Sequence, residues 1–287
     1  MESSTLRRRA EDLLHLHRPG DPVVLINAWD VVSARIVERA GAAAIATSSA
    51  AIAWALGYPD GEEISRDEML EVVARIARAV SIPVTADLEA GYGPTPKHVA
   101  DTVRLAIESG AVGMNLEDCI ATADRDASDP LYSIDAAAER VAAARDAAHA
   151  CGIPFVINAR TDVFLRQTGD PATRLERAIE RANAYHAAGA DSLFVPGTLE
   201  REQIRTLARE IVGPLNVLAL PGGASIHELA ELGVGRISVG GGAARAALAA
   251  LAQGAADAYE HGRLDTLLAH TLPSLELNGL FRQSTHA

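Results

Sequence analysis

Acidic side chains recur in three short segments, each of which follows an apolar stretch of the chain. A-D-L-E carries Asp87 and Glu89, and N-L-E-D carries Glu117 and Asp118. The third segment, N-A-R-T-D, carries Arg160 two residues before its aspartate. Alternate residues of a strand point to the same face, so we expect Asp87 and Glu89 to share a side. Carboxylates that gather at one place repel one another unless a cation compensates. Oxygen donors of this kind suit a hard divalent ion, so the sequence predicts a site for Mg²⁺, or for Mn²⁺ in its place.

Groups that could hold a substrate lie near these acids. Arg160 is able to form a bidentate pair with a substrate carboxylate, and the loop with Ser48 and Ser49 offers further donors. A 2-oxo acid chelates a divalent ion through its carboxylate and carbonyl oxygens, and the ion then stabilises an enolate. These residues therefore predict metal-assisted chemistry on a small 2-oxo acid. Carbon–carbon cleavage, decarboxylation and C–P chemistry all pass through such an enolate.

The segments that must position these residues alternate between two kinds. Short runs rich in valine and isoleucine fit parallel strands that are buried on both faces, and Ala/Arg/Glu segments of helical character separate them. The predicted strands are residues 23–28, 43–47, 83–86, 113–116, 155–159, 192–195, 215–220 and 236–239. The predicted helices are residues 31–40, 66–80, 96–109, 134–150, 171–188, 199–211, 225–232 and 243–261.

A strand followed by a helix, repeated eight times over about 250 residues, predicts a (β/α)8 TIM-type barrel. An open doubly wound sheet is the alternative, but no G-x-G-x-x-G follows the first strand. In a barrel the catalytic groups lie where the strands end, which is where the acidic segments fall. We expect one domain over residues 1–287, with a core at about 23–260 and a tail at 261–287. That tail is expected to hold one helical piece at 264–270 and then to fray.

Composition narrows the class of protein. The formal charge of −12 argues against nucleic acid or an anionic membrane as a partner. The two cysteines and the lack of a signal peptide or a long apolar span favour a cytoplasmic protein. His15 and His17, at the end of an N-terminal helix, are expected on the surface.

Four segments taken together resemble the isocitrate lyase/phosphoenolpyruvate mutase superfamily. They are INAWDVVSARIVERAGAAAIATSSAAIAWALGYPDG, ADLEAGYG, GVGMNLED and INARTDVF, and they occur in family order between about residues 23 and 242. The resemblance implies a (β/α)8 barrel whose terminal helix is exchanged between subunits in a homodimer or homotetramer. It also implies a Mg²⁺ enzyme that acts on a small 2-oxo or 2-hydroxy carboxylic acid.

The resemblance implies roles for individual residues as well. Asp87 matches the aspartate that ligates Mg²⁺ directly, and Glu89 and Glu117 match acids that hold the water bound to the metal. Asp60, in L-G-Y-P-D-G, matches a further acid that reaches those waters. The substrate-binding positions are Ser48, with its neighbour Ser49, and Arg160. Asp60, Glu117 and Arg160 are thereby predicted to be catalytic.

The segment after the fourth strand departs from the best-known members. CIATADRDASDPLYSID contains neither the K-K-C-G-H lid of the lyases nor the K-x-N-S of the mutase. Decarboxylation tolerates a missing lid cysteine, because loss of carbon dioxide itself gives the enolate. We therefore predict a carbon–carbon lyase or decarboxylase.

Two alternatives stay open. One is C–P chemistry of the phosphonopyruvate hydrolase or phosphoenolpyruvate mutase type, which the acids Asp124, Asp126 and Asp129 would oppose by repelling a phosphonate. The other is a non-catalytic homologue that binds a metabolite. The retained metal-site carboxylates argue against it, because a scaffold has no use for clustered charge.

Overall fold

A barrel of parallel strands forms the body of the molecule. The computed structural model describes residues 2–120, 129–198 and 200–282. Within them the sheet runs in the order β1-β9-β8-β7-β6-β5-β4-β3-β2, and every pairing is parallel. The strands are β1 (Val23–Leu25), β2 (Asn27–Ala28), β3 (Ile45–Thr47), β4 (Val84–Asp87), β5 (Gly113–Glu117), β6 (Val156–Arg160), β7 (Ser192–Phe194), β8 (Leu215–Leu218) and β9 (Arg236–Ser238).

The barrel closes on a strand that is interrupted. Only Ile26 separates β1 from β2; β1 pairs with β9 and β2 pairs with β3. The side chain of Asn27 fastens this junction. Its Nδ2 donates to the carbonyl of Thr47 at 2.7 Å, and its Oδ1 accepts from the backbone N–H groups of Val239 and Gly240 at 3.0 and 2.9 Å. β1 and β2 are thus two parts of one strand, and the predicted eight-stranded TIM-type barrel is confirmed.

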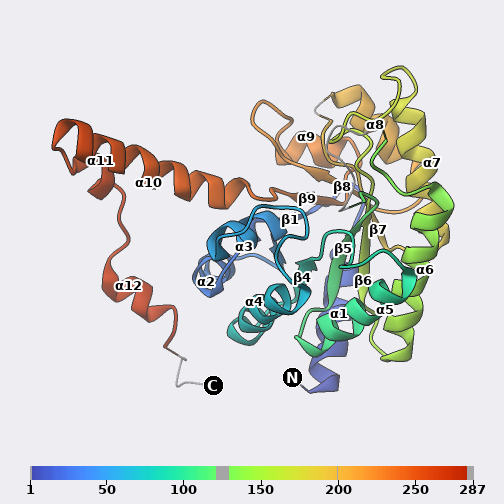
Figure 1. The fold of residues 1–287 in the computed structure, drawn as a ribbon, viewed down its shortest axis with the longest axis horizontal. Coiled ribbons are helices and arrows are strands. Elements are labelled where there is room, and N and C mark those ends of the chain that lie inside the picture. The colour runs from blue at the N-terminus through green and yellow to red at the C-terminus, as the bar shows by residue number, and fades with distance from the viewer. Residues whose placement is uncertain (1, 121–128, 199, 283–287) are drawn as a thin grey trace.

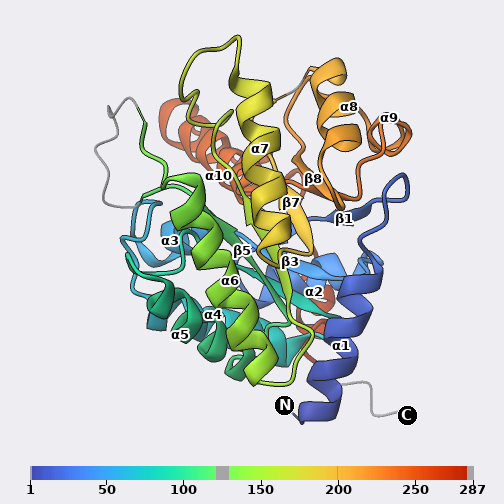
Figure 2. The same ribbon diagram turned by 90° about the vertical axis from the view of Figure 1, so that its right-hand side faces the viewer.

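Helices cover the outside of the sheet, as Figure 2 shows for α6 and α7. Several begin at a side-chain cap: Asp30 and Ser33 form a capping box, and Ser65 and Ser225 accept from the backbone N–H three residues on. Each predicted helix in the barrel is found, with its ends within three residues of the expected ones. The helices around the barrel, predicted or not, are α1 (Ser3–His15), α2 (Val31–Arg39), α3 (Ser49–Leu56), α4 (Arg66–Ala79), α5 (Pro96–Glu108), α6 (Ile134–Ala150), α7 (Arg174–Ala187), α8 (Arg201–Glu210) and α9 (Ile226–Glu231).

The helix α3 follows β3 directly and was not predicted. Its sequence, SAAIAWAL, is short and has no polar face, so it shows no amphipathic period. Its position matters because its first turn carries Ser48 and Ser49 to the end of the neighbouring strand β4.

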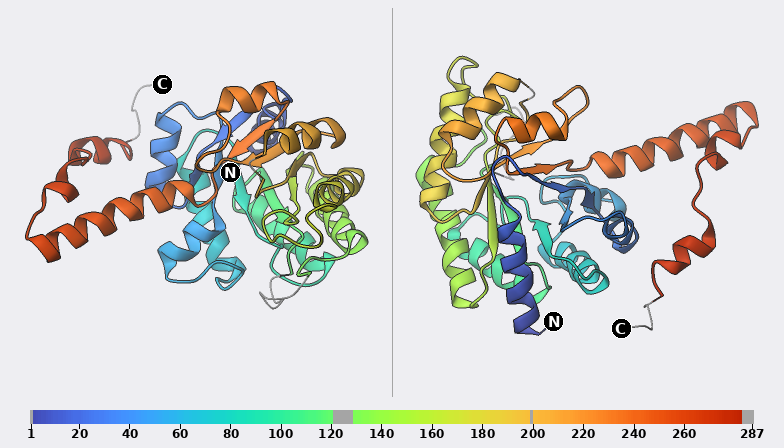
Figure 3. Two further views of the ribbon diagram at one scale, coloured as in Figure 1. Left: turned by 90° about the horizontal axis from the view of Figure 1, so that it is seen from above. Right: turned by 180° about the vertical axis from the view of Figure 1, so that it is seen from behind.

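The last three helices form an arm that leaves the barrel (Figures 1 and 3). They are α10 (Gly242–His261), α11 (Asp265–Leu268) and α12 (Ser274–Gly279). Most of α10 is exposed, up to 91% at Tyr259 near its tip. The arm returns to its own barrel at α12, where Arg35 Nε of α2 donates to the carbonyl of Leu280 at 2.8 Å. The expectation that the tail frays after residue 270 is wrong, because α12 lies there; six residues are too few to show a helical period.

The interior of the barrel holds a chain of polar side chains, which we call the axial network: His17, Arg236, Asn115 and Asn158. Arg236 Nη1 lies 3.3 Å from His17 Nε2, and its Nη2 donates to Asn115 Oδ1 at 3.2 Å. Asn158 Nδ2 donates to the same oxygen at 2.8 Å. His17 was expected on the surface, and that is wrong: it is 7% exposed, because α1 lies across the end of the barrel. Burial lowers the pKa of His17 to about 3, so it is neutral and accepts from Arg236.

Among the described residues, no helix is both long enough and apolar enough to span a membrane.

Candidate active site

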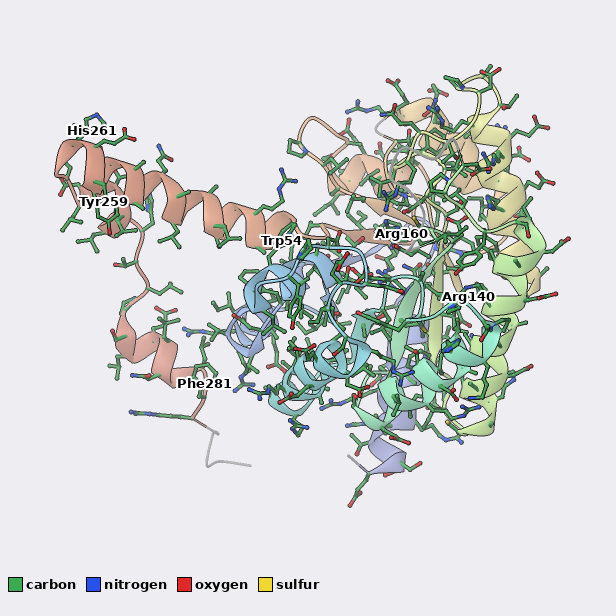
Figure 4. The ribbon with its side chains drawn as sticks, in the orientation of Figure 1. Trp54, Arg140, Arg160, Tyr259, His261 and Phe281 are labelled. Carbon is green, nitrogen blue, oxygen red and sulfur yellow. The ribbon has the colours of Figure 1, made fainter. Side chains whose placement is uncertain are left out.

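The predicted acids meet where β4, β5 and β6 end. The register of these neighbouring strands sets Asp87 beside Asn115, and Glu117 beside Arg160. Arg160 lies at this end of the sheet in Figure 4. Parallel strands bring their carboxyl ends to one side of a barrel, which is why three segments far apart in sequence come together.

Asp87 is the most firmly held of the acids. Its Oδ2 accepts from the N–H and the hydroxyl of Ser49, at 2.9 and 2.8 Å, and its Oδ1 accepts from Asn115 Nδ2 at 3.0 Å. Its own N–H donates to Thr47 Oγ1 at 2.9 Å. A carboxylate has about four lone-pair positions. Three of them are used, so the remaining one, on Oδ1, suits a single direct bond to a cation.

Glu89 reaches the site by a different route from the one predicted. β4 ends at Asp87, and Glu89 has a left-handed backbone with φ of 49°, so strand alternation does not apply to it. Its Oε2 accepts from the N–H of Glu62 at 2.6 Å, and Glu62 Oε1 accepts from the N–H of Tyr92 at 2.8 Å. Glu62 and Tyr92 are left-handed as well, with φ of 59° and 57°. Such backbone outliers cost free energy, and they cluster at functional sites.

A buried arginine supports this unusual turn from behind. Arg140 of α6, labelled in Figure 4, donates to the carbonyls of Ala90 and Gly93. Its guanidinium lies 4.4 Å from the ring centre of Tyr132. This contact was not predicted, because Arg140 lies in an Ala/Arg/Glu helix whose pattern is typical of a solvated face.

Glu117 and Arg160, which were predicted to face the metal and the substrate, form an ion pair with each other. Arg160 Nη1 lies 2.7 Å from Glu117 Oε2. Its Nε and Nη2 form a fork on Asp162, at 2.5 and 2.9 Å. Burial alone would lower the pKa of Arg160, but the charges of Asp162 and Glu117 outweigh that and raise it. The fork that was predicted for a substrate carboxylate is therefore filled by Asp162.

Asp118, the neighbour of Glu117, faces away from these groups. Its Oδ1 accepts from the N–H of Asp162 at 2.9 Å, and its Oδ2 accepts from the hydroxyl of Tyr185 at 2.7 Å. Arg181 Nε lies 3.4 Å from the same oxygen. Asp118 therefore positions Asp162, which in turn holds Arg160.

The remaining predicted residues lie around the rim. Ser48 is the N-cap of α3, and its Oγ accepts from the N–H of Ala51 at 3.3 Å. Ser49 is bound to Asp87. Asp60 lies in the loop between α3 and α4. Desolvation and then the charge of Asp87 raise the pKa of Asp60.

The electrostatics of the site fit a hard cation. Burial, followed by the charges of Asp60 and Asp87, raises the pKa of Glu89 to about 8. Burial also raises the pKa of Glu117, although Arg160 opposes the rise. Within the described ranges, no three His, Cys, Asp or Glu side chains come together as a set of direct ligands. One direct carboxylate, with others acting through water, is nevertheless how Mg²⁺ is often bound, since it keeps several of its waters.

Two residues of the fourth loop that the sequence analysis named, Asp124 and Asp126, lie outside the described residues. Asp129 is described, and its carboxylate lies 2.7 Å from Arg177 Nη2. Sequence reasoning missed Glu62, whose contacts to Glu89 and Tyr92 come from a loop with no strand period. Asn115, at the end of the N-L-E-D strand, lies in the site, where its Nδ2 donates to Asp87.

Comparison with known proteins identifies relatives of the chain. The family described as phosphoenolpyruvate phosphomutase matches residues 13–259. An uncharacterized protein of Mycobacterium tuberculosis (strain H37Rv) is 34% identical, over 78% of this chain and 80% of that protein. The 2-methylisocitrate lyase of Escherichia coli (strain K12) is 33% identical, over 70% of each chain. The oxaloacetate decarboxylase of Paraburkholderia xenovorans is 31% identical, over 76% of this chain and 70% of that enzyme.

Solved structures share the whole fold. A putative lyase/mutase from Burkholderia cenocepacia superposes with a TM-score of 0.89 at 41% identity, over 98% of both chains. An oxaloacetate acetylhydrolase with the inhibitor 3,3-difluorooxalacetate gives 0.83 at 27% identity, over 95% of this chain and 92% of that one. A phosphonopyruvate hydrolase with oxalate and Mg²⁺ gives 0.81 at 25% identity, over 95% and 94%.

Proposed function

This chain belongs to the isocitrate lyase/phosphoenolpyruvate mutase superfamily, and we propose that it is a Mg²⁺-dependent lyase acting on a small 2-oxo or 2-hydroxy carboxylic acid. The observation that carries the proposal is the gathering of Asp60, Glu89 and Glu117 around one free carboxylate position on Asp87; burial and then neighbouring charges raise the pKa of these three acids. Four acids beside one arginine are costly for a fold and useful only with a cation.

The proposed division of labour follows the hydrogen bonds. Asp87 would hold the ion directly through Oδ1, because Ser49 occupies Oδ2. Asp60, Glu89 and Glu117 would hold it indirectly, through water. When bound, Mg²⁺ (or Mn²⁺) supplies the positive charge that stabilises an enolate of the substrate.

Substrate binding is proposed for the rim. The hydroxyl proton of Ser48 is free to donate to a carboxylate oxygen, because the helix cap uses only its lone pair. Arg160 has two N–H groups beyond the three that Asp162 and Glu117 engage, and these can face the substrate. Arg160 would thus bind a substrate carboxylate less tightly than an unpaired guanidinium would. It also holds Glu117 in place.

For the reaction we propose carbon–carbon cleavage or decarboxylation. The oxaloacetate decarboxylase and 2-methylisocitrate lyase among the relatives support this choice. Cys119 is poorly suited to acid–base work, because burial raises the pKa of its thiol to about 12. C–P chemistry is the second candidate, and the phosphonopyruvate hydrolase among the structural neighbours favours it.

We also propose a homodimer or homotetramer in which the exposed helix α10 of the arm is exchanged between subunits. The support is the exposure of apolar residues along it, including Leu248, Leu251 and Tyr259 at 50%, 56% and 91%. Contiguous apolar surface of this kind marks an interaction site. The barrel and its arm, residues 1–287, act as one unit in this proposal. The scarcity of cysteine supports a place in the reducing cytoplasm.

The test is pyruvate formation from oxaloacetate, 2-methylisocitrate and phosphonopyruvate, coupled to lactate dehydrogenase, with and without EDTA. We expect turnover of one substrate that EDTA and Asp87→Ala both abolish. Asp101→Ala, on the exposed face of α5, is the matched control and should leave activity unchanged. Turnover of phosphonopyruvate alone would favour the second candidate. No turnover together with unchanged Mg²⁺ affinity in Asp87→Ala would refute the proposed site.

A further inference from the structure

Most of the hydrogen-bond donors of Arg160 are already engaged by other side chains of the protein. Arg160 makes a fork with Asp162 and an ion pair with Glu117, so its single charge faces two carboxylates. A substrate with one carboxylate can be held by the metal and by the two N–H groups that Arg160 has left. A substrate with two carboxylates needs another cation at the barrel mouth.

Arg166 is placed to be that cation. It lies six residues beyond the end of β6, in a turn where its backbone N–H donates to the carbonyl of Asp162 at 2.8 Å. Its Nε lies 3.8 Å from Asp162 Oδ2, which is an ion-pair distance but too long for a hydrogen bond. The side chain is 40% exposed, and its guanidinium makes no hydrogen bond to any of the described residues. Arg166 thus stands beside the Arg160–Asp162 pair with its donors available.

The backbone beneath Arg166 is fixed by a close contact. The turn at residues 163–167 lies on Gly197, which follows β7 and has φ of 102°. A Cβ at Gly197 would come within 2.7 Å of the N atom of Leu165 and 2.9 Å of the carbonyl carbon of Phe164. Only glycine permits this approach. The turn is therefore held by the barrel, and only the side chain of Arg166 has freedom to reach a ligand.

The charge of Arg166 also reaches the other loops of the mouth. It opposes the rise in pKa of Asp60, in the loop after α3, and of Cys119, which follows β5. Its guanidinium lies 3.8 Å from Asp162, just beyond the carboxyl end of β6, and so on the mouth side of the barrel.

We propose that Arg166 binds the second carboxylate of the substrate and so makes the site specific for dicarboxylic 2-oxo or 2-hydroxy acids. This inference rests on the proposed function, because the first carboxylate is held at the Asp87 end. A charge-assisted hydrogen bond from Arg166 gives the diacid its advantage, and the guanidinium fork suits a carboxylate better than an ammonium would. Arg166 then selects the substrate, while the acids around Asp87 supply the common chemistry.

The test compares two ligands that share the metal-chelating group. Oxalate fills only the chelating position, whereas 3,3-difluorooxaloacetate adds a distal carboxylate. Binding of each is measured by calorimetry at saturating Mg²⁺ for the wild type, Arg166→Gln and Arg166→Lys. In Arg166→Gln we expect the affinity for difluorooxaloacetate to fall at least tenfold, with the affinity for oxalate changed less than twofold. Arg166→Lys keeps the charge and should recover part of the loss.

Arg75→Gln is the matched control, since Arg75 is an exposed arginine of α4 that is paired with Glu71. It should leave both affinities unchanged. Unchanged difluorooxaloacetate binding in Arg166→Gln, or an equal loss for both probes, would overturn the role of Arg166 while leaving the proposed function intact. Failure of the wild type to bind difluorooxaloacetate, with oxalate bound, would do the same. Failure of the wild type to bind oxalate with Mg²⁺ would instead remove the proposed function, and this inference with it.

Discussion

The mouth and the interior of the barrel each bury an arginine, and each meets its charge in a different way. Arg160 at the mouth faces two carboxylates within 2.7 Å. Arg236 in the interior is 1% exposed and contacts an amide and a neutral imidazole; among the described residues it has no carboxylate within ion-pair distance. Burial lowers the pKa of Arg236 to about 10, with the charge of Asp87 opposing that shift.

The difference separates charge that serves the fold from charge that serves the site. In the interior, a neutral amide links the charged Arg236 to Asp87. Arg236 donates to Asn115, and Asn115 donates to Asp87. The mouth gathers more negative charge than its arginine can balance. An excess that the fold does not need is the physical mark of a site that receives a cation and its ligand.

Arg160→Met should produce the largest effect. It leaves Glu117 without its partner and Asp162 with only the longer contact to Arg166, and breaking a buried pair in this way costs about 3–5 kcal/mol. We expect a loss of that order in the free energy of unfolding by urea at pH 7, together with loss of activity. The control is Arg205→Met, which removes an exposed partner of Glu202 and should cost less than about 1 kcal/mol. Equal losses of unfolding free energy in Arg160→Met and Arg205→Met would show that the ion pairs at the mouth are no more costly to break than an exposed pair.

Glu89→Gln tests the excess charge through pH. Because the pKa of Glu89 is raised to about 8, the folded protein binds more protons than the unfolded one between about pH 4.5 and 8. The stability of the metal-free protein should therefore fall as pH rises through this window, by up to about 1.4 kcal/mol per pH unit. Glu89→Gln should flatten the slope, and Mg²⁺ should reverse it in the wild type. A slope that is the same in wild type and variant would show that Glu89 carries no excess charge.

Arg236→Met should affect stability less than Arg160→Met does, since no carboxylate loses its partner. Asn115 Oδ1 keeps its bond from Asn158, so the cost should stay below about 2 kcal/mol. Removal of a positive charge on the Asp87 side should tighten Mg²⁺ binding several-fold, as measured by calorimetry. Weaker binding would mean that Arg236 instead orients Asp87 through Asn115.

The smallest effects come from two helix caps. Ser48→Ala and Ser225→Ala each remove a side-chain cap and should each cost about 1 kcal/mol of stability. Ser48 adjoins Ser49, which binds Asp87, whereas Ser225 is exposed and its hydroxyl accepts from the N–H of Glu228, so only Ser48→Ala should raise the KM for the substrate. A matching rise in KM for Ser225→Ala would place the effect in the fold and not in the site.

Sequence patterns predicted the barrel because each buried strand is a short apolar run and each glycine-ended helix leads into the next. They placed Asp87, Glu117 and Arg160 at one edge for the same reason. They could not show that Asp162 fills the fork of Arg160, since two residues of one strand end do not reveal which partner a side chain selects. Nor could they show that Glu89 leaves the strand, because its left-handed backbone depends on Glu62, in another loop.

The other misses have a common cause. His17 is polar and follows a helix, so its type and position suggested exposure, but α1 covers the end of the barrel and carries it inside. Arg140 and Arg236 likewise look like solvated cations in sequence. The partners of all three come from distant segments, and no local period encodes such contacts.

The interrupted strand has a consequence for synthesis. Asn27 fastens the barrel to residues 239 and 240, so the ring stays open until more than two hundred further residues have left the ribosome. The strands β4 to β6, which carry the acids, are contiguous in the chain and pair with one another well before then. Contacts between distant segments form late, because closing a long loop costs more entropy than closing a short one. The growing chain can therefore assemble its three central strands first, and the seam at Asn27 is the last part of the ring to join.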